Sequence, residues 1–473
     1  MTTYRNKPTA TPEHRPLPPI PNGTADSAVP LFIGYTARAG RFSAHELILK
    51  PTLVGSLLEF ETLFGPPRFE TYSVDVARDT NGNLHIRSIS EPERSYLLYF
   101  SVKLFFHNGG RRCYIVSVGT FQPMPVIDLR GDGTLSPSTG FGLLDGLEVA
   151  SMEPGTTLLA APEAVKLNTS DYATLTGAML EQCHRLGDRF ALFDVRECDA
   201  RLDNDGIARN RTLYGNNWLS HGAAYFPMLR AALDPVLQER NGASNVQVAI
   251  DGRLEVDLAS LCDTHPALYQ SVREAVEHSL ISVPPSGAIA GLYAASDERR
   301  GAWSPPTNIG LASIIEPTVA LDDAGEEALV VDRNGGRSIN TLRAFDSYGT
   351  RALVALTLAG KDPDFRFVSA RRLCIAVSRA LREATEWTTG SANHLDTWAA
   401  VRAIAERYLE QIWRHGALAG RSPVDAFYVN CGFGSTMAAR DVLEGRLIIE
   451  YGLALRMPGA FTVQRIIHRT QHG

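Results

Sequence analysis

Apolar residues in the first two thirds of the chain fall into short blocks whose spacing alternates between that of strands and that of helices. Apolar, β-rich runs predict buried strands at 28–36, 113–118, 157–162, 190–195 and 246–250. Runs with apolar residues on one helical face predict helices at 97–106, 170–186, 217–233 and 265–279. Strands that alternate with helices favour a mostly parallel sheet with helices on its faces, so we predict an α/β domain over residues 28–283.

Two stretches of this domain, at about 50–95 and 122–150, break the alternation because turn residues and charged residues dominate them. We predict that both are excursions from the domain rather than parts of its core. The alternation stops at Pro284 and Pro285, and residues 284–340 are predicted to form a loop-rich connecting segment.

The last third of the chain predicts a second α/β domain over residues 341–473. We expect a strand at 353–358, helices at 369–383 and 393–415, and then strands at 426–430, 446–455 and 461–469. In the strand at 446–455, Leu447, Ile449 and Tyr451 alternate with more polar positions, which is typical of a sheet with one buried face. The last strand has no later partner in the chain, so it must pair with an earlier strand or with another molecule.

Residues 1–27 contain six prolines. Proline fixes φ and lacks a backbone N–H, so this segment forms neither a helix nor a central strand. We predict an extended N-terminal arm.

Composition and charge narrow the class of protein. The chain has 473 residues, of which 44% are hydrophobic and 21% charged, which is ordinary for a globular protein. Its formal net charge of −6 disfavours a dedicated nucleic-acid-binding protein. No run of about 18 apolar residues is present, so we expect no membrane-spanning helix and no direct insertion into a membrane.

Local signatures of catalysis are absent from the sequence: it has no phosphate-binding loop, no nucleophile elbow and no zinc-protease helix motif. His468 and His472 are expected to lie in a frayed tail, and residues 203–206 resemble only part of a calcium-binding loop. We therefore predict no catalytic residue, no metal site and no cofactor. Two other classes stay open, namely a soluble α/β enzyme with an unrecognised site and a monomeric binding module that uses Arg130-Gly131-Asp132.

Six blocks spread along the chain carry a family resemblance. They are AVPLFIGYT at 28–36, FFHNGGRRCYIV at 105–116, PPSGAIAGLYAASDERRGAW at 284–303, INTLRAFDSYGTRALVALTLAGKDPDFRFVSARRL at 339–373, LEQIWRHGALAGRSPVDAFYVNCG at 409–432 and DVLEGRLIIEYGLALRMPGAFTVQRI at 441–466. In this order they closely resemble the sheath proteins of contractile tails, which include phage tail sheaths, R-type pyocin sheaths and the sheaths of extracellular contractile injection systems. The two excursions are not covered by the resemblance.

The resemblance implies a structural protein rather than an enzyme. Sheath subunits form six-membered rings that stack helically around an inner tube, and contraction from a metastable extended state drives the tube through a target membrane. The implied partners are further copies of the chain, the inner tube protein, sheath paralogues, and baseplate or terminal cap proteins. It also implies assembly in the bacterial cytoplasm as part of a phage tail-like particle, with the first domain facing outward and the last domain facing the tube.

Two sets of candidate residues follow from the resemblance. Neighbouring sheath subunits exchange strands, and the candidates for exchange in the last strand are Phe461, Val463, Arg465 and Ile467. The helix that begins near Ser369 carries the candidates for an electrostatic contact with the tube, which are Arg371, Arg372, Arg379 and Arg382. The alternative for these arginines is a solvated basic face that contacts no partner.

The later blocks favour an extracellular contractile injection system, with a phage or pyocin tail sheath as the alternative. One feature departs from the family: the proline-rich arm stands where family members carry a strand signal. Because prolines cannot donate to a strand ladder, this departure argues against exchange of an N-terminal strand. We hypothesise that the chain is a sheath paralogue of a terminal layer.

Overall fold

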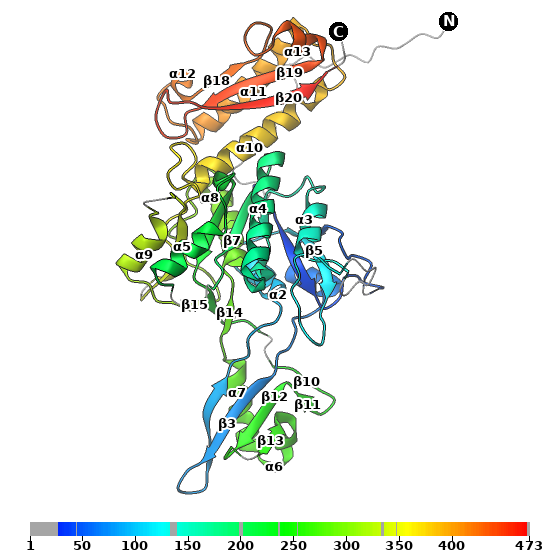
Figure 1. The fold of residues 1–473 in the computed structure, drawn as a ribbon, viewed down its shortest axis with the longest axis vertical. Coiled ribbons are helices and arrows are strands. Elements are labelled where there is room, and N and C mark those ends of the chain that lie inside the picture. Colours follow the sequence, from blue (N-terminus) through cyan, green and yellow to red (C-terminus); the bar gives the residue numbers. More distant parts are fainter. Residues whose placement is uncertain are drawn as a thin grey trace, which may run out of the picture. The chain divides into compact units, whose positions relative to one another are not determined.

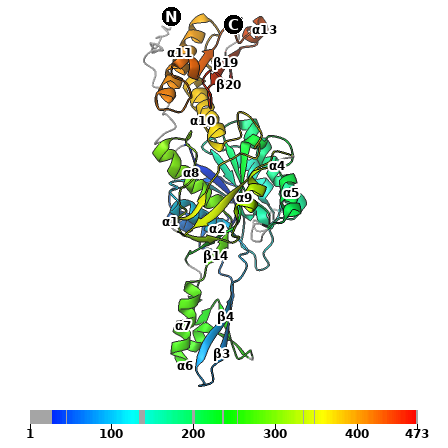
Figure 2. The ribbon, with the colours of Figure 1, turned by 90° about the vertical axis from the view of Figure 1, so that its left-hand side faces the viewer.

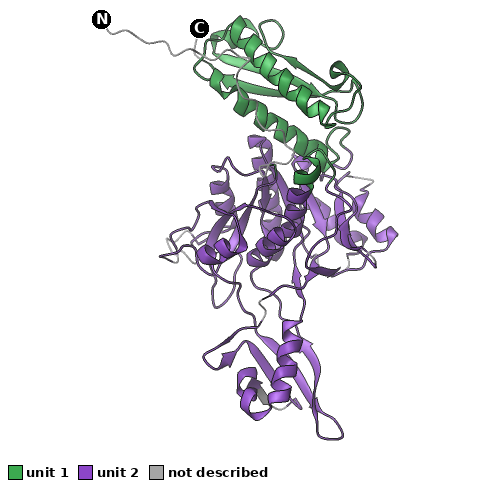
Figure 3. Ribbon diagram, turned by 180° about the vertical axis from the view of Figure 1, so that it is seen from behind, with its two compact units in different colours: residues 1–27, 296–305, 362–473 green, residues 28–295, 306–361 purple. Residues whose placement is uncertain are grey.

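The computed structural model describes residues 27–43, 45–132, 140–197, 202–234, 237–252, 254–332, 335–346 and 348–470. The chain forms two compact units (Figure 3). The large unit comprises residues 28–295 and 306–361, and the C-terminal unit comprises residues 296–305 and 362–473 together with the N-terminal residues up to Ser27. Apart from Ser27, the predicted N-terminal arm lies outside the described residues.

A mixed sheet of eight strands is the centre of the large unit (Figures 1 and 2). Its order is β17-β16-β8-β7-β6-β1-β5-β2. Six strands are parallel: β1 (Pro30–Thr36), β5 (Cys113–Thr120), β6 (Leu158–Ala160), β7 (Phe190–Asp194), β8 (Gly222–Phe226) and β16 (Ile339–Phe345). The antiparallel strands β2 (Thr52–Val54) and β17 (Gly349–Ala352) flank them. The prediction of a mostly parallel sheet is confirmed.

Helices pack on both faces of this sheet. On one face, α2 (Leu98–His107) contacts β1 through Phe105 and Phe32, whose ring centroids are 5.8 Å apart. On the other face, α3 (Leu143–Ala150) and α4 (Thr169–Leu186) cover a core that includes Ile33. The unit also contains α1 (Leu57–Phe64), η2 (Pro162–Lys166), α5 (Asn204–Thr212), η3 (Leu219–His221), α9 (Asp323–Val330) and the first part of α8 (Ser286–Arg300).

Smaller sheets complete the large unit. Four strands in the order β13-β12-β3-β4 form one of them: β3 (Tyr72–Arg78), β4 (Leu84–Ser90), β12 (Val246–Ile250) and β13 (Leu254–Asp257). It is accompanied by η4 (Leu258–Ser260), α6 (Leu261–Thr264) and α7 (Pro266–Glu277). A three-stranded sheet joins β9 (Leu229–Ala231), β14 (Ile281–Val283) and β15 (Ile314–Pro317), and β10 (Glu239–Arg240) pairs with β11 (Ala243–Ser244).

Several predicted elements and boundaries of the large unit are wrong. Residues 217–233 form η3, β8 and β9 instead of a helix, because Pro227 interrupts the run and removes a backbone donor. The predicted strand at 353–358 lies beyond the end of β17. The excursion at 122–150 contributes α3 to the core, and the excursion at 50–95 contributes β2 to the eight-stranded sheet.

The predicted connecting segment at 284–340 is also wrong, because it contains α8, β15 and α9. Its last residues begin β16, which pairs in parallel with β8 through Ile339 and Ala224. This long-range pairing holds residues 339–352 in the sheet of the large unit. The last boundary between the units therefore lies at 361–362, not at 340–341, and residues 296–305 of the predicted segment belong to the C-terminal unit.

The C-terminal unit is a two-layer α/β structure. Its helices are α10 (Val368–Thr385), η5 (Glu386–Thr388), α11 (Leu395–Arg414), α12 (Pro423–Ala426) and α13 (Ala439–Leu443). Its antiparallel sheet has the order β18-β19-β20, with β18 (Phe427–Asn430), β19 (Arg446–Leu453) and β20 (Thr462–Arg469). Leu447, Ile449 and Tyr451 are fully buried in a core shared with α10 and α11, as the alternation predicted.

The helices α2 and α8 approach each other closely in the large unit. A Cβ atom on Gly287 would lie 2.2 Å from the carbonyl oxygen of Ser101, and one on Gly291 would lie 2.5 Å from the carbonyl oxygen of Phe105. These positions therefore accept only glycine while the two backbones stay at this distance.

We expect Gly287→Ala to lower the free energy of unfolding by about 1–3 kcal/mol, the usual cost of overpacking. Gly177→Ala in α4 is the matched control, because a Cβ there meets nothing within 4 Å. In a helix this substitution stabilises by about 1 kcal/mol. Urea denaturation of both variants measures the two effects, and equal effects of the same sign would contradict the close approach of α2 and α8.

Candidate functional site

The open edge of the C-terminal sheet is the feature most suited to bind another chain. Strand β20 pairs with β19 alone among the described strands. The N–H of Thr470 donates to the carbonyl of Gly445 at 2.8 Å, which fixes the phase of the antiparallel ladder. Because backbone groups alternate along such a ladder, residues 463, 465 and 467 direct their N–H and C=O groups away from β19.

The side chains along this edge lie on the exposed face of the sheet. Val463 is 48% exposed and Ile467 is 55% exposed. Between them, Arg465 Nη2 lies 2.7 Å from Glu450 Oε2 on β19. Phe461 precedes β20 and packs edge-on against Tyr428, with ring centroids 5.2 Å apart. Val463, Arg465 and Ile467 thus lie on the edge strand, whereas Phe461 lies just before it with its ring against β18; the exchange itself stays a prediction.

Polar contacts on the buried face hold the sheet on α10. Ser378 Oγ lies 2.6 Å from Tyr451 Oη, and Thr385 Oγ1 lies 2.7 Å from His468 Nε2. Burial lowers the pKa of His468, with a smaller contribution from the positive charge of Arg382. The expectation that His468 lies in a frayed tail is wrong, because β20 extends beyond it; His472 lies outside the described residues.

The arginines of α10 do not form one exposed surface. Arg371 is buried with its guanidinium 3.5 Å from the ring centroid of Phe365. Arg372 is buried in an ion pair with Asp297. Arg379 is half-buried and Arg382 is exposed. Arg371 and Arg372 are thus engaged within the subunit, and Arg379 and Arg382 are more accessible; the tube contact stays a prediction.

The ion pair of Arg372 also anchors the base of the N-terminal arm. Arg372 Nη1 donates to Asp297 Oδ1 at 2.9 Å, and its Nη2 donates to the carbonyl oxygen of Ser27 at 3.0 Å. The Ser27 hydroxyl donates to Asp297 Oδ2 at 2.7 Å. One buried cluster thus joins α10, the end of α8 and the last residue of the arm. Helical spacing alone did not indicate this role.

The other motifs singled out in the sequence have structural roles. Asp203 caps α5 by accepting from the N–H of Gly206, so residues 203–206 begin a helix. Arg130 lies 2.6 Å from both Asp145 Oδ1 and Glu148 Oε1 on α3. These ion pairs engage the arginine that a binding module would have to present, and residues 133–139 lie outside the description.

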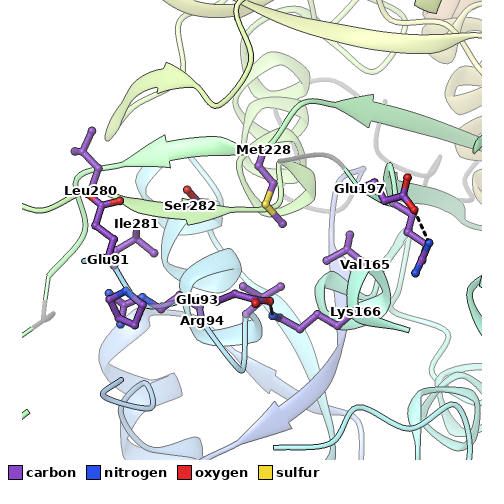
Figure 4. A pocket seen from close by; sticks show the side chains of 13 residues that line it. Glu91, Glu93, Arg94, Val165, Lys166, Glu197, Met228, Leu280, Ile281 and Ser282 are labelled. Carbon is purple, nitrogen blue, oxygen red and sulfur yellow. Dashed lines mark hydrogen bonds and ion pairs between the residues drawn. The ribbon is translucent and has the colours of Figure 1, made fainter. Parts of the chain in front are cut away.

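A cavity of about 630 Å³ opens in the large unit near the carboxyl ends of β6, β7 and β8 (Figure 4). Lys166 pairs with Glu93 there, and Arg196 Nη1 lies 2.9 Å from Glu197 Oε1. Cationic and anionic side chains of the lining thus neutralise each other. The lining residues include neither a cysteine nor a histidine.

Two buried carboxylates near this cavity escaped the sequence analysis. Burial raises the pKa of Glu163 and of Asp194 to about 7. The backbone donors that contact Glu163 belong to residues 97 and 98, more than 60 positions away in the chain. No local pattern reveals such a contact.

No group of three or more His, Cys, Asp or Glu side chains among the described residues is placed to hold a metal ion. Within the same residues, no helix combines the length and apolar character needed to cross a membrane.

Comparison with solved structures identifies the fold. The chain matches the sheath complex of an extracellular contractile injection system, PVC, in the contracted state, with a TM-score of 0.60 and 23% identity over 98% of both chains. It matches the helical sheath of the anti-feeding prophage (AFP) in the contracted state with a TM-score of 0.62 and 22% identity, again over 98% of both chains. The six-fold symmetrised AFP baseplate gives a TM-score of 0.61 and 23% identity over 98% of both chains. Neither the protein-family models nor the curated proteins give a match to this chain.

These likenesses cover nearly the whole chain, so both units share the fold of contractile sheath proteins. The fold implied by the sequence resemblance is confirmed. The matched structures come from sheath and baseplate assemblies and not from enzymes.

We expect Arg372→Met to lower the free energy of unfolding of the C-terminal unit by about 3–5 kcal/mol, because it leaves the Asp297 carboxylate buried and unpaired. Arg382→Met removes the same group from the exposed end of α10 and should change stability by about 0.5 kcal/mol or less. Chemical denaturation followed by tryptophan fluorescence measures both.

A double variant distinguishes the loss of the ion pair from the loss of packing as the cause of the lower stability. Adding Asp297→Leu to Arg372→Met removes the uncompensated charge and should recover much of the loss. The free energy of unfolding that the double variant loses is compared with the sum of the losses in the two single variants. If the two are equal, the buried ion pair is not the reason for the effect of Arg372→Met.

Proposed function

We propose that the chain is a structural subunit of a contractile sheath. The observation that carries this proposal is the open edge of β20, presented by a unit whose fold is that of contractile sheath proteins. An exposed strand edge binds a strand from another chain through main-chain hydrogen bonds. In a sheath, such pairing joins copies of this chain into six-membered rings that stack helically around an inner tube protein.

The same pairing supports contraction. Main-chain hydrogen bonds along the open edge of β20 hold neighbouring copies together while rigid bodies rotate between two packings. Met457-Pro458-Gly459, with Gly459 at φ 74°, lies in the connection between β19 and β20 of the same sheet. We propose that contraction from a metastable extended state drives the inner tube through a target membrane and needs no cofactor.

The likeness to the PVC and AFP sheaths supports an extracellular contractile injection system over a phage or pyocin tail. We propose assembly in the bacterial cytoplasm within a phage tail-like particle, with contacts to baseplate or terminal cap proteins and to sheath paralogues. A terminal-layer position remains our hypothesis on the strength of the proline-rich arm. A reconstruction that shows this chain uniformly along the trunk would rule out that position.

The backbone direction at residue 467 gives a sharp test of the sheath assignment. Ile467→Pro removes an N–H that points away from β19, so it costs no hydrogen bond within the subunit; an edge strand tolerates proline there. We expect the variant to melt like the wild type but to form no sheath in a co-expression with the tube protein. Electron microscopy and circular dichroism measure the two properties.

Ile467→Thr is the matched control, because it changes the exposed side chain and keeps the backbone donor. It should assemble. Normal assembly of a folded Ile467→Pro subunit would contradict pairing through this edge.

The remaining arginines of α10 test the tube contact. We expect Arg382→Glu combined with Arg379→Glu to reduce co-purification of the tube protein, and we expect the wild-type contact to weaken with salt, because exposed charges are screened over roughly 10 Å at 0.1 M ionic strength. Arg414→Glu on α11, an exposed arginine of the same unit, is the control for the change in charge. Undiminished co-purification of the double variant would assign Arg379 and Arg382 to a solvated face.

A further inference from the structure

The N-terminus of α2 is capped by a side chain from a distant part of the chain. Its N-cap residue, Leu97, offers no side-chain cap. Instead, Glu163 in η2 places Oε1 at 3.1 Å from the N–H of Leu97 and at 2.8 Å from the N–H of Leu98. These are orphan donors of the helix, and the positive end of the helix dipole favours an anion there.

The second oxygen of the same carboxyl group is buried against β1. Glu163 is 0% exposed, and its Oε2 has no hydrogen-bond partner. A Cβ atom on Gly34 would lie 2.2 Å from this oxygen, so the side chain fills the space above the strand. Its titratable neighbours are Tyr35 on β1 and Tyr96 before α2. Burial disfavours the charged carboxylate, and the hydrogen bonds that it accepts offset only part of that cost. The pKa of Glu163 is therefore raised.

Asp194 repeats the arrangement one strand away. It ends β7, and its Oδ1 accepts the N–H of Ser286, the first residue of α8, at 2.7 Å. The carbonyl oxygen of Asp194 accepts from the Tyr172 hydroxyl at 2.7 Å. Since α2 and α8 touch through Gly287 and Gly291, the two carboxylates fix the N-termini of a pair of helices that pack together.

The topology of the sheet explains why Glu163 lies where related sheets bind ligands. The chain enters β5, on one side of β1, directly after α2, and then crosses through α3 to β6 on the other side of β1. In doubly wound sheets, ligands bind outside the carboxyl ends of the strands at such a reversal, often with an anionic group on a helix N-terminus. Glu163 follows β6 at this point. Leu97, whose N–H it accepts, and Val165, two residues after it, belong to the lining of the cavity in Figure 4.

We propose that two side chains of the chain itself occupy the place where doubly wound sheets bind anions. Glu163 and Asp194 act as internal carboxylate ligands for the N-termini of α2 and α8. When the Glu163 side chain is removed, the space that it occupied accepts a free small carboxylate. The large unit thereby keeps the architecture of a ligand-binding α/β domain as a rigid structural body. The inference concerns the large unit alone and does not depend on the sheath assignment.

Chemical rescue tests the proposal. Glu163→Ala should lower the melting temperature of the full chain, and roughly 100 mM sodium formate or acetate should restore at least half of the loss by binding the folded state. Sodium chloride at the same ionic strength should restore none of it, and formate should leave the wild type unchanged. Glu93→Ala removes a carboxylate that is 88% exposed and should show neither loss nor rescue. Equal effects of formate and chloride on Glu163→Ala would overturn the proposal.

If Glu163→Ala does not fold, a more conservative variant tests whether the Glu163 carboxylate caps α2. Glu163→Gln keeps the size and the acceptor oxygen but replaces a charge-assisted hydrogen bond with a neutral one. The amide protons of Leu97 and Leu98 should then exchange at least about tenfold faster with solvent, since tenfold is the effect of about 1.4 kcal/mol. The amide of Asp171, capped by Asn168 within its own helix, should keep its rate. Unchanged exchange at Leu97 and Leu98 would show that the Glu163 carboxylate does not hold α2.

Discussion

The open edge of β20 is the constraint on which the proposed assembly depends. Residues 463, 465 and 467 direct their N–H and C=O groups away from β19, where solvent or a further strand can meet them. Such an edge can bind one partner strand in one register only if β20 itself is held in place, and contacts within the C-terminal unit hold it. Its buried face packs on α10 and α11, hydroxyl contacts at Ser378 and Thr385 fix the sheet on α10, and the buried pair of Arg372 with Asp297 ties α10 to the end of α8.

The large unit has an architecture that is common among enzymes. Its six parallel strands and helices on both faces form a doubly wound sheet, and the position where such sheets take ligands contains a carboxylate of the chain itself. Glu163 and Asp194 satisfy helix donors that a bound anion would otherwise satisfy, and glycines allow α2 and α8 to pack together. Both features favour a stiff body over an adaptable site, as the proposed rotation of whole subunits requires.

Elements with a strong local pattern could be predicted from the sequence, and features that depend on distant pairing could not. The alternation of Leu447, Ile449 and Tyr451 indicated the buried face of β19, and helical spacing indicated α10 and α11. The domain boundary was missed because β16 returns to pair with β8 across more than 100 residues. Arg371 and Arg372 were assigned to the surface because spacing along a helix does not say which face meets Phe365 or Asp297. Glu163 carries no local signal, since the topology of the sheet alone brings it to Leu98.

We propose that this chain assembles through a strand edge into a sheath around a tube. The measurement to make first is electron microscopy of the full chain co-expressed with an inner tube protein. We expect tubes or rings with six-fold symmetry in which β20 has a strand of a neighbouring copy at its open edge. A monodisperse population of single subunits at the same concentration, with the tube protein present and folded, would contradict it.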